Sequence, residues 1–395
     1  MELLFSSQQW LALLPPIILC ILLFSYVYII LWLRPERLRQ KLRSQGVRGP
    51  KPSFLFGNIP EMRRIQQLAK SAHEQEAGST DMFSSNYVAT LFPYFLHWSR
   101  VYGSIYLYST GSIQVLNVTD PNMVKELANC KSLDLGKPCY LQKERGALLG
   151  MGILTSNGDL WVHQRKVIAP ELFMERVKGM VNLMMEAAMS MLNSWKNEVE
   201  DRGGSAEIVV DEFLRTFSAD VISRACKEIF IKIRQLQKAM AKQSMLIGVP
   251  GSRYISETTH ETLRLYPPAS FVAREALNDM KLGGIDIPKG TNIWIPIAMA
   301  HRDPSVWGPS ADKFDPDRFA NGIAGACKPP HMYMPFGVGV RTCAGQNLAM
   351  VELKVVLSLL LSKFEFKLSP NYVHCPAFRL TIEPGKGVPL IFREL

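Results

Sequence analysis

One glycine-rich loop near the C-terminus constrains this chain more than any other segment. Residues 335–345 read PFGVGVRTCAG, and a long apolar helical pattern follows over 346–363. Gly337 lets the backbone turn tightly and approach a flat ring closely, and Gly345 lets the next helix begin close under that ring. The loop amides and the N-terminus of that helix favour the thiolate of Cys343 over the thiol. The arrangement suits a thiolate ligand to haem iron.

Two side chains of the loop fit the same purpose. Phe336 can pack beside the sulfur, and Arg341 can pair with a haem propionate by charge-assisted hydrogen bonds. A thiolate ligand pushes electron density to haem iron and favours cleavage of the O–O bond. A lone cysteine would instead be interpreted as a buried residue in a tight turn. The whole loop resembles the haem-binding loop of the cytochrome P450 family, F-x-x-G-x-R-x-C-x-G, at every defined position.

Two further segments resemble the same family, in the family's order. Glu261 and Arg264 lie three residues apart on a helical pattern, so they share a helix face and can pair. Alone, such a spacing usually means a solvated ion pair. Residues 314–319 read FDPDRF, similar to the family's P-E-R-F element, with Asp317 in place of the usual Glu. The resemblance implies that Arg318 joins the pair in a buried network on the proximal side.

Three arginines fall where the family binds the haem propionates. Trp161 and Arg165 are separated by four residues and lie on one helix face, and the family's W-x-x-x-R helix points at a propionate. Arg274, in the segment FVARE, matches another propionate partner. Each arginine alone is as well explained by an exposed charge. Together they imply that haem b is bound by Cys343, Arg165, Arg274 and Arg341, with Cys343 as the metal ligand.

The N-terminus has the features of a membrane anchor. Residues 11–33 contain no charged side chain, and at about 1.5 Å per residue this run crosses a hydrocarbon core of about 30 Å. Basic residues crowd directly after it, whereas Glu2 is the only charge before it, so the body belongs in the cytoplasm. A cleaved signal peptide is the alternative. It needs a short apolar core and a small-residue cleavage site, and Ile29–Leu33 offers neither.

The chain therefore divides into three parts. They are an anchor over 1–33, a basic and proline-rich hinge over 34–52, and a haem-thiolate monooxygenase domain over 53–395. The hinge is similar to the one that sets the family's catalytic body on the membrane. The resemblance implies a single-pass protein of the endoplasmic reticulum, whereas the residues themselves indicate only a membrane.

The body is predicted to be mainly helical with small sheets, as in the cytochrome P450 fold. A chain of 395 residues with 47% hydrophobic content can bury an ample core. Alternating patterns predict one hairpin from Tyr102–Thr110 and Ile113–Val118, and another from Phe378–Glu383 and Val388–Phe392. A helical pattern covers Gln346–Lys363.

One element of the family is missing. Its oxygen-activating helix carries A-G-x-[DE]-T-[TS], where the acid and the threonine relay protons, and the interval between Arg165 and Glu261 contains no such motif. That interval is short by about a hundred residues, enough for several helices of roughly 12 residues each. We therefore expect an internal deletion between 226 and 261, from a splice form or a faulty gene model, and an incomplete distal half. Catalytic residues stay unassigned; Thr258 or Thr259 is either a substitute relay or an ordinary helix-start threonine.

Three functions remain open. The first is a monooxygenase that hydroxylates or epoxidises a small molecule with O2 and electrons from a membrane-bound NADPH-dependent reductase. The net charge of +10 suits an acidic partner, with Lys166, Arg176 and Lys354 as contacts, although plain basic surface or anionic lipid explains it equally. The second is a shortened isoform that binds haem without productive turnover. The third is a membrane-anchored interaction protein that competes for the reductase.

The substrate is defined only as apolar. Phe271, Val272 and the methionine-rich stretch Met180–Met191 offer little polarity, whether they form core or channel wall. Residues 146–170 and the hinge at Gly49-Pro50 resemble the plant group that oxidises hormones. Within that group the chain is most similar to the gibberellin-oxidising subfamily, which implies a diterpenoid substrate. No feature indicates a nucleic-acid partner.

Overall fold

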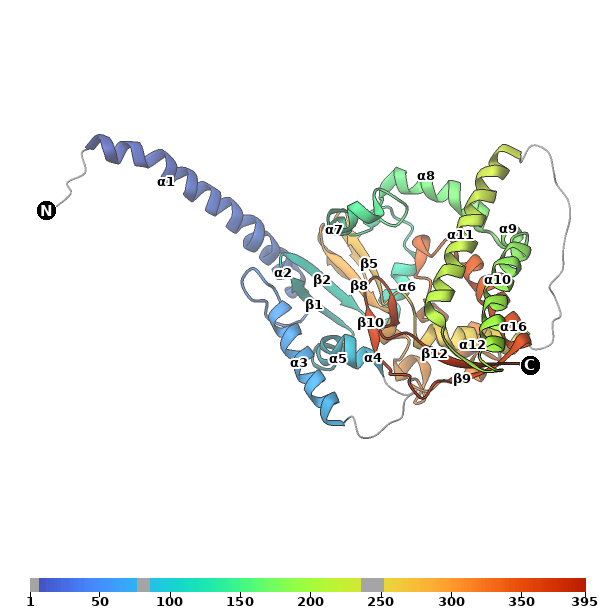
Figure 1. The fold of residues 1–395 in the computed structure, drawn as a ribbon. Coiled ribbons are helices and arrows are strands. Elements are labelled where there is room, and N and C mark those ends of the chain that lie inside the picture. The colour runs from blue at the N-terminus through green and yellow to red at the C-terminus, as the bar shows by residue number, and fades with distance from the viewer. Residues whose placement is uncertain (1–6, 77–85, 236–251) are drawn as a thin grey trace.

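The computed structural model describes residues 7–76, 86–235 and 252–395, and these are mainly helical with four small sheets (Figure 1). The predicted fold class is therefore confirmed. Residues 236–251, inside the interval where we expect a deletion, lie outside the described part. Within that part, helix α11 (Val210–Gln235) runs without a break across Cys226-Lys227, where the apolar pattern of the sequence stops.

A long apolar helix projects from the rest of the molecule (Figure 1). Helix α1 (Ser7–Tyr28) continues through the π-helical turn η1 (Ile29–Leu33) into α2 (Arg34–Arg43). The helical stretch Pro15–Arg43 is long and apolar enough to span a membrane. Its most apolar window has a mean hydropathy of 2.5, and no residue of that window is buried in the body. Exposure of so many large apolar side chains is stable only in a lipid environment.

The largest sheet has five strands and contains the first predicted hairpin. Its order is β1 (Ile105–Thr110), β2 (Ile113–Val118), β8 (Asn292–Pro296), β5 (Phe271–Ala276) and β3 (Leu135–Gly136). Only β2 and β8 pair in parallel. Strand β1 begins three residues later than predicted because Tyr102 ends helix α5 (Pro93–Tyr102).

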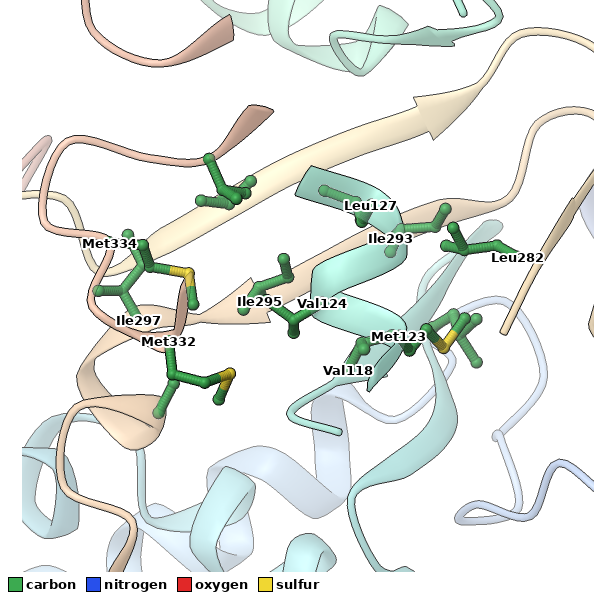
Figure 2. Close-up of a cluster of buried hydrophobic side chains, with 14 of the residues drawn as sticks. Val118, Met123, Val124, Leu127, Leu282, Ile293, Ile295, Ile297, Met332 and Met334 are labelled. Carbon is green, nitrogen blue, oxygen red and sulfur yellow. The ribbon is translucent and has the colours of Figure 1, made fainter. Parts of the chain in front are cut away.

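Each face of this sheet is covered by helices. Helix α6 (Pro121–Asn129) packs Met123, Val124 and Leu127 onto Ile293 and Ile295 of β8, so these side chains form one buried cluster (Figure 2). The opposite face carries an aromatic cluster from α4 (Tyr87–Leu91), α5 and the strands. The sheet is thus sandwiched between two apolar layers, which fixes the position of β5 and of the loop that follows β3.

Arg39 joins α2 to the same sheet. Its guanidinium is 2% exposed, donates to Glu36 at 2.8 Å, and reaches Gln114 of β2 at 3.3 Å. It also lies 5.1 Å from the ring centroid of Trp32. The end of the anchor is therefore held against the body by a buried, charge-assisted contact.

A helical layer forms the second core. Helices α10 (Val181–Asp201), α11 and α16 (Gln346–Lys363) pack together, and Met184 and Met191 are buried among them. The predicted helix over 346–363 is confirmed at both ends. The methionine-rich stretch is therefore core, as one of the two interpretations held.

The second predicted hairpin is wrong. Strand β12 (Pro389–Glu394) pairs with β4 (Ala206–Val209) and β9 (Phe364–Leu368) instead of with the residues just before it. Those residues form their own small hairpin, β10 (Pro376–Phe378) with β11 (Ile382–Pro384). Alternation identified β12, but it placed one strand over Phe378–Glu383, where β10 ends and β11 begins. It also carries no information about which distant strand is the partner.

The remaining elements connect these layers. They are α3 (Ile59–Glu76), α7 (Cys139–Leu149), α8 (Gly158–Ile168), η2 (Ala169–Leu172), α9 (Met174–Lys178), α12 (Ser252–Leu265), β6 (Met280–Leu282), β7 (Ile285–Ile287), α13 (Ile297–Ala300), α14 (Pro304–Trp307), η3 (Pro316–Phe319), α15 (Gly322–Ala326), η4 (Pro330–Met332) and η5 (Gly339–Arg341).

Candidate haem-binding site

The cysteine loop folds as a tight, glycine-dependent turn. Gly337 has a φ of 80°, a backbone conformation that favours glycine. No atom lies within 4 Å of where a Cβ would be, so glycine is required here by the conformation and not by a lack of space. Gly339 has a φ of 75°, and a Cβ there would lie 3.1 Å from the carbonyl oxygen of Ala128 on α6. The loop is therefore both twisted and pressed against α6.

Cys343 occupies the end of this turn. Its amide donates to the carbonyl of Phe336 at 2.9 Å, which closes the loop, and its side chain is exposed. Exposure excludes the alternative of a buried structural cysteine. The residue lies directly before α16, and a Cβ on Gly345 would lie 3.9 Å from its sulfur. The thiol is thus free and exposed, three residues before the helix begins.

Helix α8 and the cysteine loop are in contact through two arginines, Arg165 on the helix and Arg341 on the loop. The guanidinium of Arg341 lies 4.2 Å from the ring centroid of Trp161, a cation–π geometry, and donates to the carbonyl of Ser156 at 3.0 Å. Arg165, one turn after Trp161, donates to the carbonyl of Thr342 at 2.7 Å. The predicted i, i+4 pair therefore faces the cysteine loop from one side of α8.

Strand β5 brings the third predicted arginine to the loop. Arg274 is 4% exposed and donates to the carbonyl of Val338 at 3.2 Å. Its place is set by the pairing of β5 with β8 in the middle of the large sheet. The structure thus gathers Trp161, Arg165, Arg274 and Arg341 around the segment that carries Cys343.

A fourth cation lies here that sequence reasoning missed. Lys137 follows the short strand β3, which pairs with β5 beside Arg274. Burial, with added repulsion from Arg274 and Arg341, lowers the pKa of Lys137 to about 7. Burial also lowers the pKa of Arg274 to about 10, and Arg341 adds to that effect. The sequence around Lys137 carries no marker for this role; only the pairing of β3 with β5 reveals it.

These cations fit the carboxylates of a haem. Among the described residues, neither Lys137, Arg274 nor Arg341 has a carboxylate within ion-pair distance, although burial of an unpaired charge is costly. Nearby anionic groups would relieve the mutual repulsion. Two propionates supply two such charges, and the exposed thiol of Cys343 offers the ligand for the iron. The donor set is therefore consistent with the prosthetic group that the sequence predicts.

A separate buried network lies behind the site. Arg264 donates to both carboxylate oxygens of Glu261 at 2.7 Å, and both side chains are fully buried. Arg318 lies 3.7 Å from the same carboxylate and also donates to the carbonyl of Trp307. The three residues that the two sequence segments supply are thus in contact, with Asp315 donating its amide to Glu261 as well.

The two threonines considered as a substitute for the distal motif lie within a helix. Helix α12 begins at Ser252, so Thr258 and Thr259 lie inside the helix and the interpretation as helix-start residues is wrong. Thr259 donates to the carbonyl of Ile255 at 2.7 Å, an ordinary intrahelical contact. Phe271 and Val272 lie in the two apolar layers on opposite faces of the large sheet.

Comparisons with known proteins agree with this geometry. The profile of the family described as Cytochrome P450 matches residues 81–246 and 251–386. The chain is 75% identical to cytochrome P450 714C2 of Oryza sativa subsp. japonica over 520 positions, which cover 99% of this chain and all of the relative. It is 40% identical to cytochrome P450 714C3 of the same organism, with 96% of this chain and 98% of the relative covered. Identity to cytochrome P450 714A2 of Arabidopsis thaliana is 35%, covering 89% and 92%.

The length of the first alignment is informative. It runs over 520 positions, 125 more than the 395 residues of this chain, so at least that many positions face a gap. Since 75% of 520 is about 390, almost every residue present has an identical partner in that relative. The family profile also matches in two pieces, which are separated by residues 247–250.

Proposed function

The chain belongs to the cytochrome P450 family, and on that premise we propose that it is a membrane-anchored haem-thiolate monooxygenase that has lost part of its distal half. The observation that carries the proposal is the exposed Cys343 just before α16, in a loop that contacts Arg274 and carries Arg341, with Lys137 nearby. These three cations have no carboxylate partner among the residues that the structure describes. When bound, haem supplies the activation of dioxygen. The chain's own residues bind it, orient it and limit the access of water.

The proposed roles follow the positions of the side chains. Cys343 ligates the iron, and Phe336, Gly337 and Gly345 shape the loop beneath the ring. Arg165, Arg274 and Arg341 hold the propionates, with Trp161 fixing Arg341 by stacking. Behind the loop, the buried network of Glu261, Arg264 and Arg318 keeps α12 and the segment before the loop in register.

Electrons come from a redox partner, as is general in the family. We propose that this partner is a membrane-bound NADPH-dependent reductase with an acidic docking surface. Lys166 and Arg176 are exposed, on α8 and α9 respectively. Lys354 on α16 is only partly exposed, and its charge adds to the lowering of the pKa of His260 that burial causes. Lys166 and Arg176 are therefore better contacts than Lys354.

The proposed substrate is a small apolar plant metabolite. The relatives named above come from rice and Arabidopsis, which supports a plant-specific reaction. A gibberellin-type diterpenoid is the specific candidate, on the resemblance of residues 146–170 and of the hinge. The anchor α1 and the basic residues after it support a single-pass protein of the endoplasmic reticulum membrane with its body in the cytoplasm.

A second function is favoured by a specific observation. An alignment of 520 positions with a chain of 395 residues supports the internal deletion that we infer between 226 and 261. Loss of the distal helix would open the haem to water and remove the proton relay. The chain would then bind haem and consume NADPH without inserting oxygen into a substrate. Binding of the reductase by a haem-free chain is the third possibility, an interaction protein.

One spectrum tests the haem site directly. The measurement is the absorption of the dithionite-reduced, CO-bound membrane fraction from cells that express this chain. We expect a strongly red-shifted Soret band that is lost in Cys343→Ala and kept in Cys139→Ala, a matched control at another exposed cysteine. An absent band, or one typical of histidine ligation, would contradict the proposal.

A second assay separates the three functions. The full chain is reconstituted with an NADPH-dependent reductase, and NADPH consumption, peroxide and hydroxylated product are measured together. Product formation coupled to NADPH supports the monooxygenase. Consumption that ends in peroxide supports the shortened, unproductive isoform. Binding of the reductase by protein without haem supports the interaction protein.

A further inference from the structure

Asn157 occupies a place that its local sequence does not explain. It is the N-cap residue of α8, a position that asparagine favours because its side chain accepts a hydrogen bond from the helix. Here the side chain makes no capping hydrogen bond. Its carboxamide instead forms hydrogen bonds with two segments that lie far away in the sequence.

The first partner is the backbone of Lys137. The Oδ1 atom of Asn157 accepts from the Lys137 amide at 2.7 Å, and its Nδ2 donates to the Lys137 carbonyl at 2.9 Å. The carboxamide therefore satisfies both backbone groups of one residue, as a neighbouring strand would. A Cβ on Gly136 would lie 2.7 Å from Oδ1, so only glycine at that position leaves room for this contact.

The second partner is the guanidinium of Arg341. Its Nη2 donates to the same Oδ1 at 2.9 Å, across 184 residues of sequence. Its Nη1 donates to the carbonyl of Ser156, and its plane stacks on Trp161. Arg341 is thus held on three sides, and two of these three contacts come from the two residues that directly precede α8.

These contacts fix Arg341 and the backbone of Lys137 beside a third cation, Arg274. Lys137 and Arg341 are close enough to Arg274 for their charges to repel. Such an arrangement is unfavourable unless neutral dipoles hold it and an anion binds to it. Asn157 supplies a neutral acceptor that orients the Arg341 guanidinium and fixes the backbone of Lys137 without cancelling either charge, whereas a carboxylate at that place would compete with the ligand.

We propose that Asn157 is a positioning residue, which holds Lys137 and Arg341 beside Arg274 as one preorganised binding surface for the two carboxylates of haem. The inference rests on the proposed function. Asn157 acts through the cations and does not itself contact the haem. Preorganisation means that these cations need not be ordered when the ligand binds, so their contribution to affinity is larger.

The test compares two ligands that differ only in the carboxylates. Full-length haem-free protein in detergent micelles is titrated with haem and with haem dimethyl ester, whose propionates are neutral, and binding is followed by the Soret absorption. Asn157→Ala is expected to weaken haem binding about 10- to 100-fold, the scale of hydrogen bonds to a charged group. Binding of the ester is expected to change less than about threefold.

Two further variants make the result specific. Asn157→Asp retains both acceptor contacts, loses the hydrogen bond that Nδ2 donates to the Lys137 carbonyl, and adds a negative charge beside the cations. It is therefore expected to weaken haem binding more than binding of the ester. Asn86→Ala removes an asparagine that does cap its own helix, α4, by accepting from Val88, and it is expected to leave both affinities unchanged.

The outcomes separate the inference from the function on which it rests. Equal losses for haem and its ester in Asn157→Ala, or unchanged haem binding, would overturn the inference and leave the haem site standing. Equal losses for haem and its ester in Asn157→Asp would also overturn it, because the added charge would then not act on the propionates. Failure of the unmodified chain to bind either ligand would overturn the proposed function itself.

Discussion

Replacement of Arg264 by methionine removes the cation at the centre of the buried network around Glu261. All five N–H groups of this guanidinium are used: two donate to the Glu261 carboxylate, and the others donate to the carbonyls of His301, Ala311 and Lys313. Both charged side chains are fully buried. Methionine fills most of the volume but satisfies none of these acceptors.

The magnitude follows from these contacts. A buried carboxylate that loses its partner costs about 3–5 kcal/mol, and each buried carbonyl that loses a donor adds about 1 kcal/mol or more. We therefore expect Arg264→Met to lower the free energy of unfolding by about 6–8 kcal/mol, comparable to the whole stability of many proteins. Arg264→Lys keeps the charge but loses the forked geometry, so its loss is expected to be intermediate.

The assay is urea-induced unfolding of the full chain in detergent micelles, followed by tryptophan fluorescence. Arg202→Met is the matched control, because its ion pair with Glu198 at 2.8 Å is solvent-exposed and should contribute less than about 1 kcal/mol. If Arg264→Met unfolded at the same urea concentration as Arg202→Met, the reasoning that this network stabilises the fold would be refuted. Where Arg264→Met does not fold at all, Arg264→Lys provides the measurable comparison.

Three further predictions concern the site and the anchor. The pKa of Lys137 is lowered to about 7 without haem, and the propionates favour its charged form, so haem affinity should fall by up to about tenfold per pH unit as pH rises from 7 to 9. In a Soret titration Lys137→Arg should abolish that slope, and a flat wild-type profile would contradict the prediction. Gly339→Ala places a side chain in a left-handed conformation and should cost about 1–2 kcal/mol in thermal unfolding, whereas Gly146→Ala, in a helix with free space, should not destabilise. Arg39→Met should release α2 from the sheet, so that chymotrypsin cuts the segment after α2 on the order of tenfold faster; an unchanged digestion rate would count against the contact.

Local patterns predicted the elements whose signals are themselves local. The helix over 346–363 is mostly apolar and follows a glycine loop, so both of its ends were predicted from the sequence. The hairpin of β1 and β2 is likewise marked by alternation around Gly111, whose φ is 58°. Arg165, Arg274 and Arg341, which we propose bind the propionates, were predicted because the family motifs fix their residue type and order.

Contacts between distant segments could not be predicted from the sequence. Lys137 and Asn157 join the site only because β3 pairs with β5 and because the start of α8 lies against the cysteine loop. No periodicity in either segment encodes those neighbours. The pairing of β12 with β4 and β9 failed for the same reason, since an alternating strand fits many partners equally well.

The contact between Arg39 and the large sheet couples the anchor mechanically to the body. Helices α1 and α2 with the turn between them extend over residues 7–43, about 55 Å at the usual helical rise. A bilayer of different thickness changes the tilt of a spanning helix. Because the inner end of this rod contacts β2, a change in its tilt would be transmitted to the large sheet. Membrane thickness would thereby set the orientation of that sheet, and of Arg274 on β5, relative to the lipid surface.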